Sequence, residues 1–133
     1  MSILLDSSFT IAFANQKDKY HENALGLSEL IKSKEFGEVF TSTYVFDETI
    51  TYILARHGHS KAVEIGKMLL NSEITVLRVS ENVFAQAWEL FQSRQNLSFT
   101  DCTNVKLMAE HNIKNLATFD HHFRQFKEIN LLI

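Results

Sequence analysis

Residues 3–6 of the chain read Ile3-Leu4-Leu5-Asp6, a run of apolar residues that ends at an acid. An uninterrupted apolar run predicts a short buried strand, and the acid marks the point where that strand stops. Residues 115–119 repeat the pattern as Asn-Leu-Ala-Thr-Phe, and Asp120 follows them. If both strands belong to one parallel sheet, they end at the same edge, where ligands of open α/β folds bind. The two acids are therefore expected to lie near each other.

Segments with strand and helix patterns alternate along the rest of the chain. We expect strands at 3–5, 38–42, 74–79, 115–119 and 130–133. We expect helices at 9–14, 20–34, 43–57, 60–70, 81–94 and 101–111, and a short helix after 120. This alternation is typical of a parallel sheet covered by helices, so the chain is assigned to the α/β class.

Small polar residues predict where the helices begin, because their side chains accept hydrogen bonds from free backbone N–H groups. The expected caps are Ser7 or Ser8, Ser42 or Thr43, Ser60, Ser80, and Thr100 or Asp101. Gly58 follows one predicted helix and suits the position just after a helix end.

The composition describes an ordinary globular protein. The 133 residues, 45% of them apolar and 22% charged, suit one domain that spans residues 1–133 and exclude disorder. The single cysteine, Cys102, excludes an intrachain disulfide and a multi-cysteine zinc site, and it favours a reducing, cytoplasmic location. No stretch approaches the ~18 apolar residues of a membrane helix, and the first six residues have no basic segment typical of a signal peptide.

The net charge of −3 and pI near 6.0 lack the basic excess that is usual for proteins that bind nucleic acid through their own charge. If the chain acts on nucleic acid, another group must attract the phosphates, and a divalent cation is one candidate.

A third acid, Glu48, lies within the predicted helix 43–57. At 100° per residue, one side of this helix carries an apolar stripe of Phe46, Ile50, Ile53 and Leu54. Glu48 lies on the opposite side, among Tyr44, Val45, Tyr52 and Ala55. Because that side is also apolar, Glu48 is expected to be half-buried and to need a partner. Its neighbour Asp47 points to a polar edge beside Thr51.

Each acid has a plain structural alternative. Asp6 and Asp101 would both serve as helix N-caps. Asp120 would start a turn, and Glu48 would be an ordinary surface acid. Other catalytic arrangements find less support, because the chain has no Gly-x-Ser-x-Gly motif and no phosphate-binding glycine loop. Cys102 is expected to be a small buried residue rather than a nucleophile.

Four short motifs nevertheless occur in one order and spacing. They are Ile3-Leu4-Leu5-Asp6-Ser7-Ser8, Ser42 with Glu48 six residues later, Leu97-Ser98-Phe99-Thr100-Asp101, and Thr118-Phe119-Asp120 with Phe123. With these motifs the chain resembles the PIN-domain nucleases, and most closely the VapC-type toxins of toxin–antitoxin pairs. Two features depart from the family pattern: Cys102 stands where a small Ala is commoner, and Thr103 and Asn104 are more polar than this helix usually is.

The resemblance implies a three-layer α/β/α sandwich with a central parallel sheet of about five strands. It implies that Asp6, Asp101, Glu48 and Asp120 bind Mg²⁺ or Mn²⁺. Thr118, and also Ser7, would hydrogen-bond the carboxylates or the attacking water. The implied activity is that of a metal-dependent endoribonuclease, with RNA as substrate, a cognate antitoxin as partner, and a homodimer as the assembly.

Two alternatives stay open: a stand-alone PIN nuclease of RNA processing or decay, and a PIN-like binding module without activity. Basic residues near the acids are either RNA contacts or solvated surface. They are His121, His122, Lys17, Lys19, Arg124 and Lys127.

Overall fold

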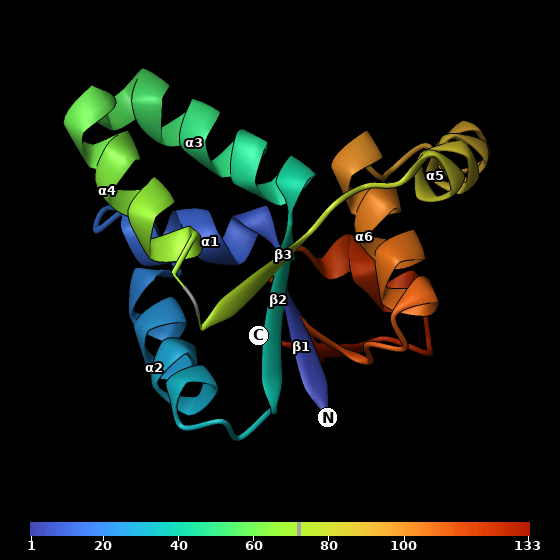
Figure 1. Ribbon diagram of the computed structural model, residues 1–133, viewed down its shortest axis with the longest axis horizontal. Helices are drawn as coiled ribbons and strands as arrows, with labels where there is room; N and C mark the ends of the chain where they lie inside the picture. The colour runs from blue at the N-terminus through green and yellow to red at the C-terminus, as the bar shows by residue number, and fades with distance from the viewer. Residues whose placement is uncertain (72) are drawn as a thin grey trace.

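The computed structural model describes residues 1–71 and 73–133, and it contains a five-stranded parallel sheet in the order β3-β2-β1-β4-β5. The strands are β1 Ser2–Leu5, β2 Glu38–Ser42, β3 Ile74–Leu77, β4 Asn115–Ala117 and β5 Asn130–Leu132. The helices are α1 Ser7–Ala14, α2 His21–Lys32, α3 Thr43–His57, α4 His59–Leu69, α5 Glu81–Ser93, α6 Phe99–Glu110 and the 3₁₀ helix η1 His121–Gln125. Helices lie on both sides of the sheet, so the α/β/α prediction is confirmed (Figure 1).

The strand order explains the layers. The chain moves outward from β1 to β2 and β3, and then crosses back past β1 to β4 and β5. Because the direction reverses, the helices of the two halves cover opposite faces: α1 and α2 lie on one side, and α5 and α6 on the other (Figure 1). The helices α3 and α4 form a hairpin on the side of α1.

The central strand β1 has a core on each face. Ile3 and Leu5 pack with α1 and α2, whereas Leu4 packs with the cluster under α5 and α6. Since successive side chains of a strand point to opposite faces, a strand buried on both sides must be apolar throughout. This requirement accounts for the uninterrupted apolar run at residues 3–5.

The carboxyl ends of β1, β2 and β4 meet at one edge of the sheet. Leu5 pairs with Ala117, and the Asp6 N–H continues this ladder by donating to the Ala117 carbonyl at 3.1 Å. Asp6 therefore leaves β1 beside Thr118, at the point where the strand order reverses. This edge is where open α/β sheets bind their ligands.

Three predicted helix starts are wrong. α1 begins at Ser7 with Asp6 before it, and α6 begins at Phe99 after the cap Ser98 rather than Thr100 or Asp101. α4 begins at His59 rather than after a Ser60 cap. Gly58, with a φ of 86°, is both the last capping residue of α3 and the residue before α4, and it has no side chain that could cap α4. The caps Ser42 and Ser80 are confirmed, since each side chain accepts a backbone N–H. In the described part of the chain, no helix has the length and apolarity needed to cross a bilayer.

Candidate active site

The carboxylate of Asp6 is the centre of a buried polar cluster. Asp6 precedes α1 but its side chain makes no cap hydrogen bond, so the capping alternative does not account for it. Its Oδ2 accepts from the Thr118 hydroxyl at 2.8 Å and from the Ser8 hydroxyl at 3.0 Å. Its Oδ1 accepts from Nδ2 of Asn104 at 3.0 Å. Donors from α1, α6 and the end of β4 thus fix a side chain that is only 2% exposed.

Burial and a neighbouring charge raise the pKa of Asp6 to about 6. The larger cause is desolvation, and the negative charge of Asp101 adds to it. Hydrogen bonds from Thr118 and Ser8 favour the carboxylate and offset part of the rise. A carboxylate held in this way is stabilised by a nearby cation.

Asp101 occupies the third position of α6 in a capping box. Its backbone N–H donates to the Ser98 hydroxyl at 3.0 Å, and its Oδ2 accepts from the Ser98 N–H at 2.9 Å. The capping alternative is therefore realised in part. Desolvation is also the main cause that raises the pKa of Asp101, and the charges of Asp120 and Glu48 raise it further. The same side chain thus supports a helix end and faces the other acids.

Glu48 is exposed, and the prediction that it is half-buried is wrong. The buried line of α3 is Val45, Thr49 and Ile53, whereas Leu54 of the predicted apolar stripe is 49% exposed. Thr49 can be buried because its hydroxyl lies 2.7 Å from both the Val45 carbonyl and the Thr10 hydroxyl. The face of α3 that carries Glu48 is consequently exposed to solvent near the carboxyl edge of the sheet. The expected partner is present, because the Ser7 hydroxyl donates to Glu48 Oε1.

Thr118 connects the remaining acid to the cluster. Its hydroxyl donates to Asp6 and accepts the Asp120 N–H at 3.0 Å. Asp120 Oδ1 accepts the His122 N–H at 2.9 Å and lies 2.9 Å from His122 Nδ1. The turn alternative for Asp120 is thus also realised. The negative charge of the same Asp120 carboxylate raises the pKa of Asp101.

Two polar residues of the cluster were not predicted as site residues. The sequence indicates Ser8 as a possible cap and as the end of the first motif; in the structure it donates to Asp6 and accepts the Phe119 N–H at 2.9 Å. Asn104 was noted only as unusually polar for its helix. It is fully buried, donates to Asp6, and its Oδ1 has no partner within the described residues. The polarity of Asn104 in this helix is a sequence signal that the residue is unusual, but it does not identify Asp6 as the partner.

The donor chemistry fits a hard divalent cation. Carboxylates are the ligands that Mg²⁺ prefers, and Mg²⁺ keeps several waters, so few direct protein ligands suffice. Burial is the main cause that raises the pKa of Asp6 and of Asp101, and nearby acids add to it, so a cation at this place would stabilise both carboxylates. Within residues 1–71 and 73–133, however, no three acidic, histidine or cysteine side chains already converge as a set of metal ligands.

The fold and this acidic edge define a class of protein. The family model of the PIN domain matches residues 3–129, and the chain belongs to the PIN-domain family. The "23S rRNA-specific endonuclease VapC20" of Mycobacterium tuberculosis is 31% identical over 123 residues, which cover 91% of each chain.

Solved structures agree with this assignment. The crystal structure of M. tuberculosis VapC20, described as a sarcin–ricin loop cleaving toxin, has a TM-score of 0.79 at 32% identity and covers 92% of this chain and 93% of its own. VapBC2 of Rickettsia felis, bound to a promoter DNA fragment, has a TM-score of 0.70 at 17% identity and covers 99% and 98%. The resemblance to VapC-type PIN domains is therefore confirmed.

Proposed function

We propose that this protein is a divalent-metal-dependent endoribonuclease of the VapC type and the toxin of a type II toxin–antitoxin pair. The observation that carries the proposal is the buried Asp6 carboxylate, which donors from three elements hold beside Asp101 at the ligand-binding edge of the sheet. Membership of the PIN-domain family and the 31% identity to an endonuclease support it.

Mg²⁺ or Mn²⁺ would be held by Asp6 and Asp101, with Glu48 and Asp120 beside them. A bound cation of this kind polarises a phosphodiester and lowers the pKa of an attacking water. The chain's own contribution is orientation. Thr118 fixes Asp6 and the backbone of Asp120 with one hydroxyl, and Ser7 fixes Glu48.

A cleavage assay with matched variants tests this function. Purified protein is expected to cut RNA in Mg²⁺ or Mn²⁺ and to stop in excess EDTA. Asp6→Asn should abolish cutting, whereas Asp47→Asn should retain most of it, because Asp47 is an exposed acid of α3 outside the Asp6 cluster. A stem–loop RNA belongs among the substrates, since VapC20 is described as cleaving such a loop. Cleavage that persists in EDTA, or an equal loss in both variants, would refute the assignment.

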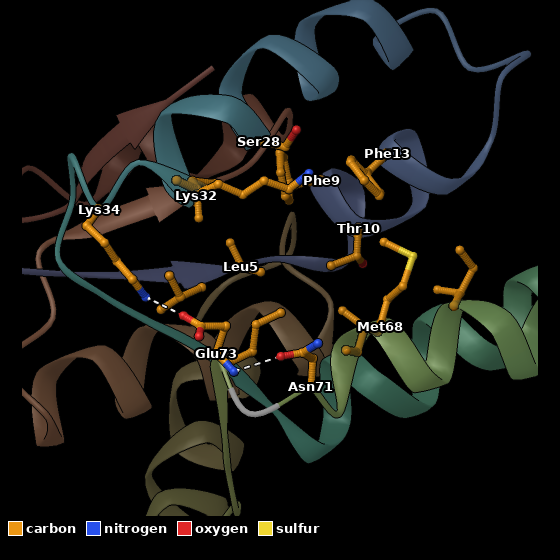
Figure 2. Close-up of a pocket in the computed structure, with 15 residues that line it drawn as sticks. Leu5, Phe9, Thr10, Phe13, Ser28, Lys32, Lys34, Met68, Asn71 and Glu73 are labelled. Atoms are coloured by element: carbon orange, nitrogen blue, oxygen red, sulfur yellow. Dashed lines mark hydrogen bonds and ion pairs between the residues drawn. The ribbon is translucent and has the colours of Figure 1, made fainter.

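The proposed antitoxin needs a surface on which to dock, and our candidate is an apolar cavity of ≈ 440 Å³ between α1, α2 and α4, on the face of the sheet that these helices cover. Figure 2 shows side chains of α1, α2 and α4 around it, among them Phe9, Phe13 and Met68, with Lys32 and Lys34 also drawn. Solved relatives in complex with antitoxins support the choice of partner. An apolar antitoxin segment would bury this surface.

Two residues of α4 offer a matched test of this docking surface. Met68 lines the cavity whereas Val63 does not, and each is 41% exposed. Met68→Asp should weaken binding of the antitoxin encoded by the neighbouring gene at least tenfold, and Val63→Asp should not. If no such gene exists, the stand-alone nuclease becomes the better description.

The homodimer remains a proposal. Its candidate contact is the outer face of α5, where Phe84, Trp88 and Phe91 are 48%, 51% and 37% exposed and pack around Phe99. Light scattering at micromolar concentration should give twice the mass of the 15.3 kDa chain, and Trp88→Glu should return it to the monomer mass. A wild-type monomer would contradict the proposal.

A further inference from the structure

Two surface hollows border the acid cluster, one lined in part by Asp120 and the other in part by Glu48. The first, of ≈ 590 Å³, is bounded by residues 18–20, Tyr52 and residues 119–122, and Ser8 lies within its lining; we call it the basic hollow. The second, of ≈ 430 Å³, is lined by Tyr44, Asp47, Glu48, Thr51, Tyr52 and Thr100. Tyr52 lines both, so the two hollows are neighbours. A strand that crosses the acids would pass from one hollow into the other.

The two hollows differ in charge. The charged residues in the lining of the second are Asp47 and Glu48; without a metal ion both carboxylates repel phosphate, and Asp47 does so even with one bound. The basic hollow contains Lys19, His121 and His122 together with Asp18 and Asp120. Its two acids keep their charge but each accepts a backbone hydrogen bond, Asp18 Oδ1 from the Tyr20 N–H at 2.8 Å and Asp120 Oδ1 from the His122 N–H at 2.9 Å. A phosphate near the acid cluster is therefore better accommodated on the basic side.

Two tyrosines that line the basic hollow each contact a cation: Tyr20 contacts Lys19, which also lines the hollow, and Tyr52 contacts Arg56, which lies next to the lining. Nζ of Lys19 lies 5.0 Å from the centre of the Tyr20 ring, and the guanidinium of Arg56 lies 4.0 Å from the centre of the Tyr52 ring. Tyr20 is itself stacked on Phe119, with ring centres 4.6 Å apart and planes 2° from parallel. Phe119 is only 6% exposed and stands between Thr118 and Asp120. Since these cations are already ordered by cation–π contacts, binding them to phosphate loses less side-chain entropy.

We propose that the basic hollow binds the phosphodiester backbone of single-stranded RNA next to the phosphate at the acids, and that Lys19 and Arg56 contact that backbone. This inference rests on the proposed nuclease function for its ligand. The volume of the hollow is within the range of sites that bind a molecule of nucleotide size. It also places a lysine in the same hollow as Asp120, on a chain whose net charge is −3.

Salt-dependent binding tests the inference without any need for catalysis. Fluorescence anisotropy with a 12-nucleotide single-stranded RNA in EDTA gives Kd over a series of salt concentrations. Each lost phosphate contact should lower the slope of log Kd against log salt by about 0.7, which is about fivefold in Kd at 0.1 M salt. Lys19→Gln and Arg56→Gln should each show this effect, and Lys19→Arg and Arg56→Lys should retain the wild-type slope.

Two exposed lysines are the controls. Lys17 lies in the same loop as Lys19 and Lys67 lies on α4, and neither lines the basic hollow. Lys17→Gln and Lys67→Gln should keep the wild-type slope and stay within twofold of its Kd. If all four glutamine variants behave alike, general surface charge binds the RNA and the inference is wrong. It is equally wrong if Lys19→Gln and Arg56→Gln leave RNA binding intact and weaken only the antitoxin complex.

The outcomes of the two proposals are separable. If Lys19→Gln and Arg56→Gln selectively lose RNA binding but the wild-type protein cuts no RNA, the inference is kept and the nuclease function is rejected. RNA cleavage by wild type with unchanged KM in both variants keeps the nuclease and rejects the inference. If cleavage and the inference both hold, KM should rise about fivefold while kcat stays within twofold, since these cations lie outside the acid cluster.

Discussion

The raised pKa of Asp6 predicts that the metal-free protein gains stability as the pH falls from 7.5 to 5. In the folded protein the carboxyl has a pKa of about 6, against 3.8 as its ordinary value. The folded state therefore binds this proton more tightly than the unfolded state does. Its contribution to stability is complete below pH 3.8 and is lost as the pH rises through 6.

The structure sets the size of this effect. The full difference between the two pKa values corresponds to about 3 kcal/mol, of which about 1.4 kcal/mol falls between pH 7.5 and pH 5.0. For a chain of 133 residues this is about 4–8 °C in the melting temperature. Asp6→Asn removes the ionisation and keeps the shape of the side chain. Its new amide group has an acceptor nearby if the Asn104 amide turns, because Asn104 Oδ1 has no hydrogen-bond partner among the residues that the structure describes.

Thermal melts of wild type and Asp6→Asn in EDTA at pH 7.5 and pH 5.0 measure the effect. Wild type should gain about 4–8 °C relative to the variant on acidification, and comparing the two proteins cancels the groups they share. Asp47→Asn, which changes an exposed acid on α3, should follow wild type. If the melting temperatures of wild type and Asp6→Asn change in parallel, the pKa of Asp6 is not raised in the folded protein.

Two further predictions concern the groups around Asp6. Asn104→Leu removes the amide donor to the Asp6 carboxylate, so the pH range over which the metal-free protein gains stability should move upward in the same melts; an unchanged range would show that the contact is weak. Asp101→Asn keeps an oxygen for the capping box and removes a charge, so the metal-free variant should melt about 2–6 °C higher than wild type. Added Mn²⁺ should then raise the wild-type midpoint much more than that of the variant, whereas an equal response would exclude Asp101 from the metal site.

Local patterns were sufficient to predict the order of the elements. The run Ile3-Leu4-Leu5 predicts a strand buried on both faces, and β1 has a core cluster on each side. Ser42 and Ser80 predict helix starts because a cap acts within three residues of its own position. The predicted placement of Asp6 and Asp120 after β1 and β4 is correct, because parallel strands end at one edge. These features depend on interactions between near neighbours in the chain.

The burial and partners of the polar groups were decided only by tertiary structure. Asn104 and Asp6 are 98 residues apart, so no local pattern indicates that an amide of α6 reaches the end of β1. Glu48 is exposed because the face of α3 that packs is set by neighbouring helices, and helical periodicity alone does not say which of two apolar faces will pack. The stack of Tyr20 on Phe119, which brings Lys19 to the acids, likewise joins distant segments. Burial and charge proximity, and hence the raised pKa of Asp6, arise only when the folded chain brings such segments together.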